Sequence, residues 1–265
     1  MTTQDSALSS PADTIHVLWE RLAGYPASAT EDALNDLLQT LCDQVNAQNA
    51  YWLGSVRISD RSPIDPLNGW RPRVLHYLHN DPERSKLTAK LAKEADRAPD
   101  PAVIEQARRA GKFRAALNRD LVPDDWAASE FNQQVYVQWG ITDTMYVTTP
   151  VNKYCEAYIG LQRKTTPDDP FTREDLKRAA TLLRGLTWFQ RRVFLSFGLM
   201  ISETPLSAME RKVMSLLLTE KSEKQIADEL NHAPTTTHSY VREIYRKLGI
   251  NSRASLAAIW LGHYV

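Results

Sequence analysis

Hydroxyl and basic side chains recur at helical spacing near the C-terminal end of this 265-residue chain. Val241, Ile244 and Leu248 follow the spacing i, i+3, i+7, which predicts one buried helical face, and Gly249 predicts the end of that helix. The opposite face carries donors suited to phosphate oxygens and guanine edges, none of them acidic: Thr235, His238, Ser239, Arg242 and Arg246. The pattern predicts a helix that can enter the major groove of duplex DNA.

Two capping signals predict the helices that precede this one. Ser207 with Glu210, and Ser222 with Gln225, have the spacing of a capping box, in which both side chains bond the first free N–H groups of a helix. Pro234 fits the first position of the helix that follows. A short helix, a tight turn and a longer helix with one buried face form a helix-turn-helix arrangement.

The charge of the chain predicts only local attraction to nucleic acid. The 32 Lys and Arg residues balance the 32 Asp and Glu residues, so no global field draws the molecule to DNA or to an anionic membrane. Residues 234–253 carry a net charge of +3, but residues 201–265 carry only +1. This weak excess predicts modest DNA affinity per protomer and dependence on a homodimer. The alternative is a helical adaptor that contacts only protein.

Three segments closely resemble the C-terminal helix-turn-helix of LuxR-type transcriptional regulators: residues 206–210 (LSAME), 222–227 (SEKQIA) and 244–250 (IYRKLGI). The resemblance implies that Lys224 and Lys247 approach phosphates and that the last helix pairs two protomers on DNA. With the pattern above, the expected DNA-binding residues are Lys224, Thr235, Thr236, His238, Ser239, Arg242, Arg246 and Lys247.

The segment also departs from the family pattern at four positions. Ala233 stands where Ser is usual, His238 where Lys is usual, Tyr240 where His is usual, and His232 where an apolar residue is usual. Loss of a Ser cap costs about 1 kcal/mol of helix stability. The target sequence of the family therefore does not transfer to this chain.

The N-terminal part alternates between helical and strand patterns. We first expect two helices, over 14–23 and from 30 onward, and then two strands, over 51–58 and 73–79. Helical segments follow over 83–111, broken at Pro99 and Pro101, and over 126–139. A hairpin of strands over 144–149 and 154–162 and a long helix over 172–196 complete this part. This order suits an antiparallel sheet with helices packed to one side, an α+β sensor-type domain. The resemblance given below implies that this domain is GAF/PAS-like.

The expected long helix carries apolar residues close to coiled-coil spacing: Ala179, Leu182, Leu186, Phe189 and Val193. They pack either against their own domain or in a dimer seam.

Four segments look like the second half of the GAF-type sensor domain of such regulators: residues 126–131, 140–143, 158–163 and 169–175. That resemblance implies a small-molecule effector bound between the sheet and its covering helices. An acyl-homoserine-lactone-type quorum-sensing domain is the alternative, although Val56 stands where its pattern of Trp followed by Tyr four residues later would place Tyr after Trp52. The candidate ligand-binding residues are Trp52, Tyr77, Phe131, Tyr136, Met145, Tyr146 and Tyr158. For each of them plain core is the favoured alternative, because aromatic residues dominate ordinary cores too.

Other chemistry is not indicated. His76 and His79 would lie on opposite faces of a strand, which argues against a metal site, and no nucleophile set, phosphate loop or carboxylate pair indicates an enzyme or a cofactor. Cys42 and Cys155 lack zinc spacing and read as free thiols, with a redox switch as the alternative.

Taken together, the sequence predicts a cytoplasmic two-domain regulator with a sensor domain over 14–199 and a DNA-binding domain over 200–265. The longest apolar stretch, residues 193–201, is shorter than the roughly 20 residues of a membrane span.

Overall fold

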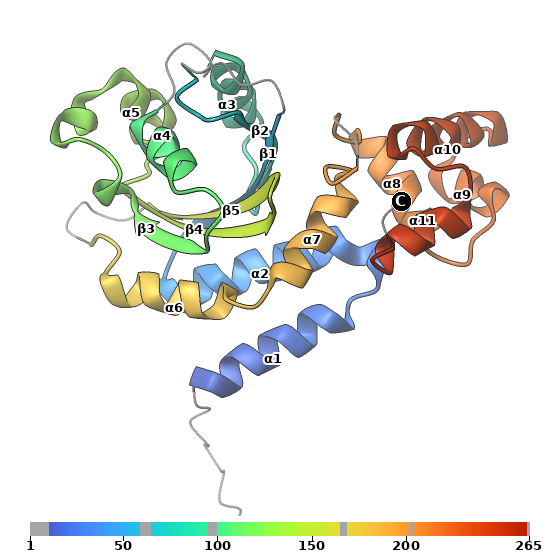
Figure 1. Ribbon diagram of the computed structural model, residues 1–265, viewed down its shortest axis with the longest axis horizontal. Helices are drawn as coiled ribbons and strands as arrows, with labels where there is room; N and C mark the ends of the chain where they lie inside the picture. The colour runs from blue at the N-terminus through green and yellow to red at the C-terminus, as the bar shows by residue number, and fades with distance from the viewer. Residues whose placement is uncertain (1–10, 59–64, 95–99, 165–168, 202–203, 264–265) are drawn as a thin grey trace, which may run out of the picture.

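The computed structural model describes residues 11–58, 65–94, 100–164, 169–201 and 204–263 (Figure 1). The N-terminal part contains α1 (Pro11–Gly24), the 3₁₀ helix η1 (Ala27–Ala29), α2 (Thr30–Val45), β1 (Asn49–Arg57), β2 (Trp70–Tyr77), α3 (Pro82–Glu94), α4 (Pro101–Arg108), β3 (Arg114–Leu117), η2 (Asn118–Asp120), η3 (Asp124–Ala128), α5 (Glu130–Val135), η4 (Val137–Trp139), β4 (Asp143–Asn152), β5 (Cys155–Arg163), α6 (Arg173–Leu183) and α7 (Thr187–Ser196). The C-terminal part contains α8 (Ala208–Leu217), α9 (Glu223–Leu230), α10 (Pro234–Leu248) and α11 (Arg253–Trp260). The predicted class, a mixed antiparallel domain followed by a helical domain, is confirmed.

The five strands form one antiparallel sheet in the order β2-β1-β5-β4-β3. The predicted hairpin is confirmed as β4 and β5, which pair Tyr146 with Gly160 and Thr149 with Ala157. The edge strand β3 was not predicted, because its four residues are too few to show an alternating pattern.

Helices cover both faces of this sheet, so the expectation of helices on one side is wrong. Figure 1 shows α2, α6 and α7 on one face and α3, α4 and α5 over the other. The segment between β2 and β4 crosses the second face instead of leaving it to solvent. The two faces therefore have different roles: one is packed as a core and the other encloses a cavity.

The packed face holds the main hydrophobic core. The apolar stripe of α2, the inward residues of β1, β4 and β5, and the apolar residues of α6 and α7 are buried together. The residues expected at coiled-coil spacing belong to it, each at most 3% exposed: Ala179, Leu182, Leu186, Phe189 and Val193. Packing within their own domain is therefore correct, and the dimer-seam alternative is wrong.

The predicted long helix over 172–196 is two helices. Thr172 and Asp175 form a capping box at the start of α6, but the chain turns at Gly185, whose φ is +98°. A Cβ atom at Gly185 would lie 2.5 Å from the Trp19 ring, so α1 packs closely against this turn. The periodicity continues on both sides of the break, which is why the sequence pattern did not reveal it.

Two other helical expectations are also corrected. The predicted helix over 126–139 is a succession of η3, α5 and η4, because Ser129 caps α5 and Gly140 ends η4 with a φ of +67°. The predicted helical stretch over 83–111 is interrupted as expected: α4 begins at Pro101 with Asp100 as its cap. Pro99 lies outside the described residues.

Cys42 and Cys155 are buried free thiols. Burial raises the pKa of Cys42 to about 12 and that of Cys155 to about 11. Because the thiolate is the reactive form, these groups are poor redox sensors, which favours the plain free-thiol interpretation.

The C-terminal helices share a second, smaller core formed by Leu206, Val213, Met214, Leu217, Ile226, Val241, Ile244, Leu248 and Leu256. Both predicted capping boxes are confirmed, at Ser207 with Glu210 and at Ser222 with Gln225. Ala233 makes no side-chain cap, so α10 begins with Pro234 alone as its starting signal.

We predict that Gly185→Ala destabilises the protein by about 2 kcal/mol, because it forces an alanine into a positive φ and into the Trp19 ring. Gly24→Ala is the matched control, since a Cβ atom there meets nothing within 4 Å. Urea unfolding of both variants provides the measurement. Equal stability of the two variants would contradict the break at Gly185.

Candidate DNA-binding face and sensor cavity

The turn between α9 and α10 is set by local chemistry. Asn231 ends α9 in the left-handed conformation, with a φ of +53°, and Pro234 fixes the first turn of α10. Val241, Ile244 and Leu248 then bury the inner face of α10 against α8 and α9. The predicted helix-turn-helix geometry is therefore present.

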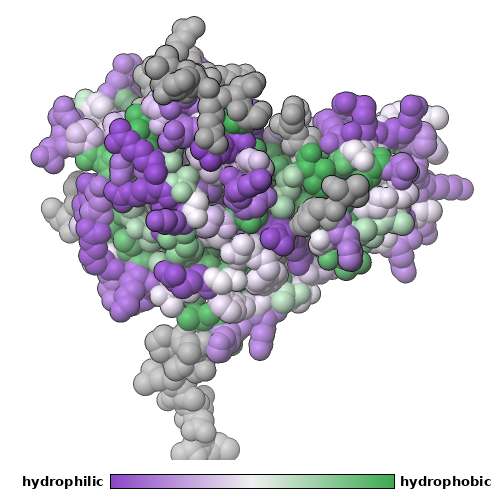
Figure 2. Space-filling view, in the orientation of Figure 1, coloured by the Kyte–Doolittle hydropathy of each residue, from purple (hydrophilic) through white to green (hydrophobic). Residues whose placement is uncertain are grey.

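The outer face of α10 is exposed along its length. Six of the expected DNA-binding residues are exposed on it: Thr235, Thr236, His238, Ser239, Arg242 and Arg246. Lys224 is exposed on α9. Figure 2 shows hydrophilic residues along the outer edge of the C-terminal part, where Figure 1 places α10. The N-terminal domain leaves this face open.

Some polar residues of this face already have side-chain partners within the protein, and others do not. The Arg246 guanidinium bonds Glu243, at 2.8 Å from Nε, and His238 Nδ1 lies 3.0 Å from Glu223 Oε2. Arg242 makes no side-chain hydrogen bond or ion pair with any residue the structure describes. Arg242 is therefore ready to bond a base edge or phosphate without first exchanging a partner.

A second candidate site lies in the N-terminal domain, on the sheet face covered by α3, α4 and α5. A cavity of about 920 Å³ opens there. Five of the seven expected ligand-binding residues line it: Tyr77, Phe131, Tyr136, Tyr146 and Tyr158. This volume is within the usual range of small-molecule pockets.

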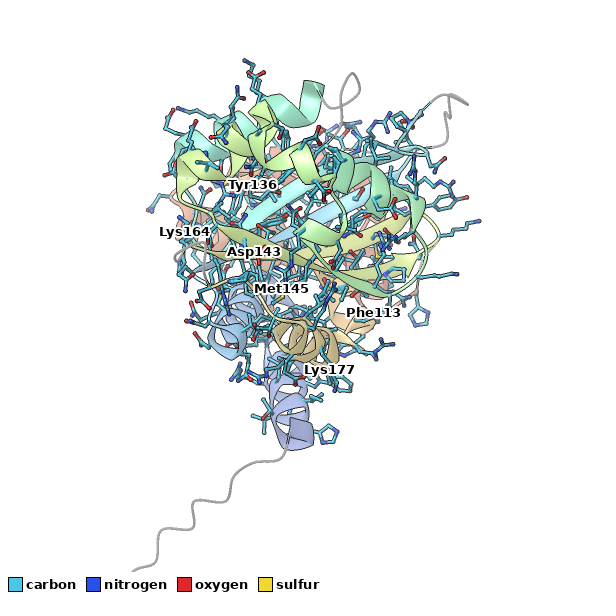
Figure 3. The ribbon with its side chains drawn as sticks, turned by 90° about the vertical axis from the view of Figure 1, so that its left-hand side faces the viewer. Phe113, Tyr136, Asp143, Met145, Lys164 and Lys177 are labelled. Atoms are coloured by element: carbon cyan, nitrogen blue, oxygen red, sulfur yellow. The ribbon has the colours of Figure 1, made fainter. Side chains whose placement is uncertain are left out.

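Trp52 and Met145 do not line the cavity, and their assignment as ligand contacts is corrected. Both are fully buried in the main core, on the packed face. Figure 3 shows Met145 on the opposite side of the sheet from Tyr136. Strand side chains alternate between faces, so their sequence neighbours Tyr51 and Tyr146 line the cavity instead. The indole of Trp52 donates to Gln190 Oε1 at 2.8 Å and stacks on Phe197.

The sequence reading missed three cavity residues of chemical interest. Tyr51 lies across β5 above Gly160, where a Cβ atom would stand 2.3 Å from its ring. Arg84 and Asp100 also line the cavity. Alternation with Trp52 could have identified Tyr51, but Arg84 lies in a charged helical stretch that gave no sign of burial.

Tyrosine hydroxyls form the polar part of the wall. The hydroxyls of Tyr136 and Tyr146 are 3.0 Å apart, and Tyr146 also donates to Asn118 Oδ1 at 3.0 Å. Burial raises the pKa of both tyrosines well above their ordinary value of 10.0, so the hydroxyls stay neutral. They can donate and accept hydrogen bonds but offer no charge.

An ion pair holds the hydroxyl of the lining residue Tyr158. Arg114 Nη2 donates to Glu156 Oε2 and to the Tyr158 hydroxyl, at 2.8 and 2.9 Å. Glu156 is fully buried, and its charge is balanced by Arg114. The Tyr158 hydroxyl is thus engaged by Arg114 and Glu156.

A family model and a curated relative identify the C-terminal part. The model described as bacterial regulatory proteins, luxR family (GerE), matches residues 204–260. The resemblance to LuxR-type regulators is thus confirmed for the helix-turn-helix over residues 204–260. The probable HTH-type transcriptional regulator GfsR of Streptomyces halstedii is 41% identical over 58 residues, which are 22% of this chain. The match covers 24% of that protein, so this chain spans about a quarter of its curated relative.

Three solved structures align with more of the chain at 14% identity each. SdiA in complex with octanoyl-rac-glycerol aligns over all of both chains with a TM-score of 0.47. SdiA of Escherichia coli aligns over 96% of this chain and 98% of its own, with a TM-score of 0.44. The VqsR LBD domain from Pseudomonas aeruginosa aligns over 66% and 94%, with a TM-score of 0.45. Among the residues that the structure describes, no helix has the length and hydropathy to cross a membrane.

Within the LuxR-type domain, Lys247 has a partner that the resemblance did not suggest. Its Nζ lies 2.8 Å from both carboxylate oxygens of Glu210, with side chains 16% and 5% exposed. Burial would raise the pKa of Glu210, but the hydrogen bonds from Lys247 and Ser207 outweigh it and hold the pKa below 4.5. Lys247 therefore ties α10 to α8 in this structure instead of pointing to a phosphate.

The LuxR-type domain contacts the N-terminal domain through Arg211 of α8. Its Nε donates to Glu31 Oε1 of α2 at 2.6 Å, and its guanidinium lies 4.7 Å from the Phe197 ring centre. Phe197 in turn stacks on Trp52 and lies beside His76, whose Nε2 is 2.8 Å from Asn35 Oδ1. One set of packed side chains thus joins β1 and β2 to the LuxR-type domain.

We predict that Lys247→Met destabilises the LuxR-type domain by about 3 kcal/mol, because it leaves the buried Glu210 carboxylate without its cation. Thermal unfolding measures the loss. Lys212→Met, at an exposed position of α8, is the control and should leave the melting temperature unchanged. A role for Lys247 in phosphate binding alone would leave both variants as stable as the parent.

We predict that the stability of His76→Gln declines less than that of the parent protein as the pH falls through the mildly acidic range. Burial lowers the pKa of His76 below 6.5, Arg211 adds to this and Glu31 opposes it. An unfolded histidine takes up its proton near 6.5, whereas folded His76 does so only at lower pH. Its contribution to stability is therefore complete above 6.5 and declines as the pH falls from 6.5 to the folded pKa.

Melting temperatures between about pH 5 and 7.5 measure this effect. His263→Gln, at an exposed position, serves as the control. An identical pH slope in His76→Gln and in the parent protein would disprove the assignment.

Proposed function

We propose that this chain is a DNA-binding transcriptional regulator whose LuxR-type domain reads the major groove and whose N-terminal domain binds a small molecule. The open outer face of α10 carries the proposal. The residues of this face can donate hydrogen bonds, and the inner face of α10 is held by the apolar core of the C-terminal helices. Recognition by such a helix needs only that its outer residues reach base edges, which exposure permits.

The residues of this face take different roles in the proposal. Arg242 binds a base edge, because it is central, exposed and without a partner among the described residues. Thr235, Thr236, His238 and Ser239 lie on the same face and complete the base readout. Lys224 on α9 binds a phosphate, and Arg246 joins it after releasing Glu243. Because Lys247 is bonded to Glu210, we assign it to the scaffold.

The two cores support a division into a sensor domain over 14–199 and a DNA-binding domain over 200–265. The main core includes residues from Leu18 to Leu199, and the second begins at Leu206. We propose that two copies bind DNA together in the cytoplasm, with half-sites about 34 Å apart. The weak positive charge of residues 201–265 makes a second copy necessary for useful affinity.

The cavity supports the sensing role. Its walls are mostly apolar, with a few hydroxyl and charged groups that could orient a ligand. The cavity strands β1 and β2 also bear Trp52 and His76, which contact Phe197 next to Arg211. A ligand that shifts these strands would therefore change the contact with the LuxR-type domain.

We predict that Arg242→Ala weakens binding to a selected duplex by about 1–3 kcal/mol and relaxes base preference, because it removes a base contact. Lys224→Ala should weaken selected and random duplexes alike and reduce the salt slope by about 1, because it removes a phosphate contact. Duplexes are first selected from a random pool with the full chain. Fluorescence anisotropy then gives the affinities at several salt concentrations.

Lys212→Ala, at an exposed position of α8, is the control and should bind like the parent. Equal effects of Arg242→Ala and Lys224→Ala on both duplexes would refute the division of roles. A chain that retards no duplex even at low salt would instead be a protein-binding adaptor.

A further inference from the structure

Arg84 of α3 is a buried cation in the wall of the cavity. It is 4% exposed, and the cavity lining includes it. Its Nη1 donates to Gln162 Oε1 at 3.0 Å, and its guanidinium lies 4.7 Å from the centre of the Tyr77 ring. Its Nε is buried and has no hydrogen-bond partner. The guanidinium thus keeps donors that the protein does not use.

Two other arginines of this domain, with side chains 11% and 6% exposed, are neutralised. Arg114 pairs with Glu156 at 2.8 Å, and Arg163 pairs with Asp169 at 2.9 Å and with Asp175 at 3.4 Å. Among the residues the structure describes, no carboxylate lies within ion-pair distance of Arg84. An arginine stays charged at any physiological pH, and a buried charge without a partner is destabilising. Arg84 therefore has the features of a cation whose counter-ion comes from a bound molecule.

The charges around Arg84 favour an anion. Asp100 lines the same cavity, but its carboxylate accepts from the Trp126 indole at 2.7 Å and from the Ala102 N–H at 2.8 Å. Asp100 is thus occupied as the cap of α4 and does not pair with Arg84. The other charged lining residues are exposed: Arg73, Lys90 and Glu130. The lining therefore carries three cations and two anions.

We propose that the sensor cavity binds a small organic carboxylate, with its anionic group on Arg84 and its apolar body along the cavity wall. The proposal rests on the sensing role proposed above and names the class of ligand. The guanidinium presents parallel N–H donors, which match the two oxygens of a carboxylate. The apolar body would contact the wall that contains Leu53, Leu67 and Trp70. A carboxylate supplies the single negative charge that would balance the Arg84 guanidinium.

Calorimetry of the full chain with decanoate, decanol and an N-acyl-homoserine lactone tests this proposal. Decanoate carries the charge, whereas decanol and the lactone are neutral. The parent chain should bind decanoate at least tenfold more tightly than decanol. Neutral probes that bind as tightly as decanoate, or no binding of decanoate, would overturn the proposal.

Variants of Arg84 separate charge from shape. Arg84→Gln should lose at least tenfold in decanoate affinity and keep its decanol affinity, whereas Arg84→Lys should keep the preference for the acid. Lys212→Gln, at an exposed lysine of α8 that does not line the cavity, is the control and should bind like the parent. Thermal unfolding confirms that each variant is folded, and Arg84→Lys supplies the answer if Arg84→Gln does not fold. An unchanged acid preference in Arg84→Gln, or its loss in Arg84→Lys, would refute the assignment.

Anisotropy with the selected duplex on the same preparations keeps the two proposals distinct. A chain that binds DNA but no acid disproves only the ligand class. A chain that binds decanoate but no duplex disproves the regulator and leaves the carboxylate site standing.

Discussion

The alternation of side chains across one antiparallel sheet organises the whole N-terminal domain. Along β1, β4 and β5, residues that face the packed core alternate with residues that face the cavity, so Trp52 and Tyr51 have opposite environments. A shift of one residue in strand pairing would exchange the two sets. Gly160 supports this register, because only a residue without a side chain leaves room for the Tyr51 ring across β5.

The packed face does more than stabilise the domain. Trp52 lies in it against Phe197 at the end of α7, and Phe197 contacts Arg211 of the LuxR-type domain. The cavity face and this contact are therefore two sides of the same strands. The function proposed above therefore needs no long-range relay, because the strands that line the cavity also carry the residues that pack against Phe197 at the junction between the domains.

Charge placement follows the same division between structure and binding. Glu210 with Lys247 and Glu156 with Arg114 are buried pairs that fix helices or strands. Their removal would leave single charges in a medium that solvates them poorly. Arg242 on the outer face of α10 is accessible to solvent and lacks a partner among the described residues, which leaves it available for a nucleic acid.

The sequence by itself determined the helix-turn-helix, because its signals are local: Ser222 caps α9, Pro234 starts α10 and Gly249 ends it. It also determined the strands β1, β4 and β5, whose alternating pattern is long enough to read. Tertiary structure alone decided which strand face was hollow. It also broke the helix at Gly185 and buried Arg84, because these outcomes depend on segments far apart in the chain that no local pattern can weigh.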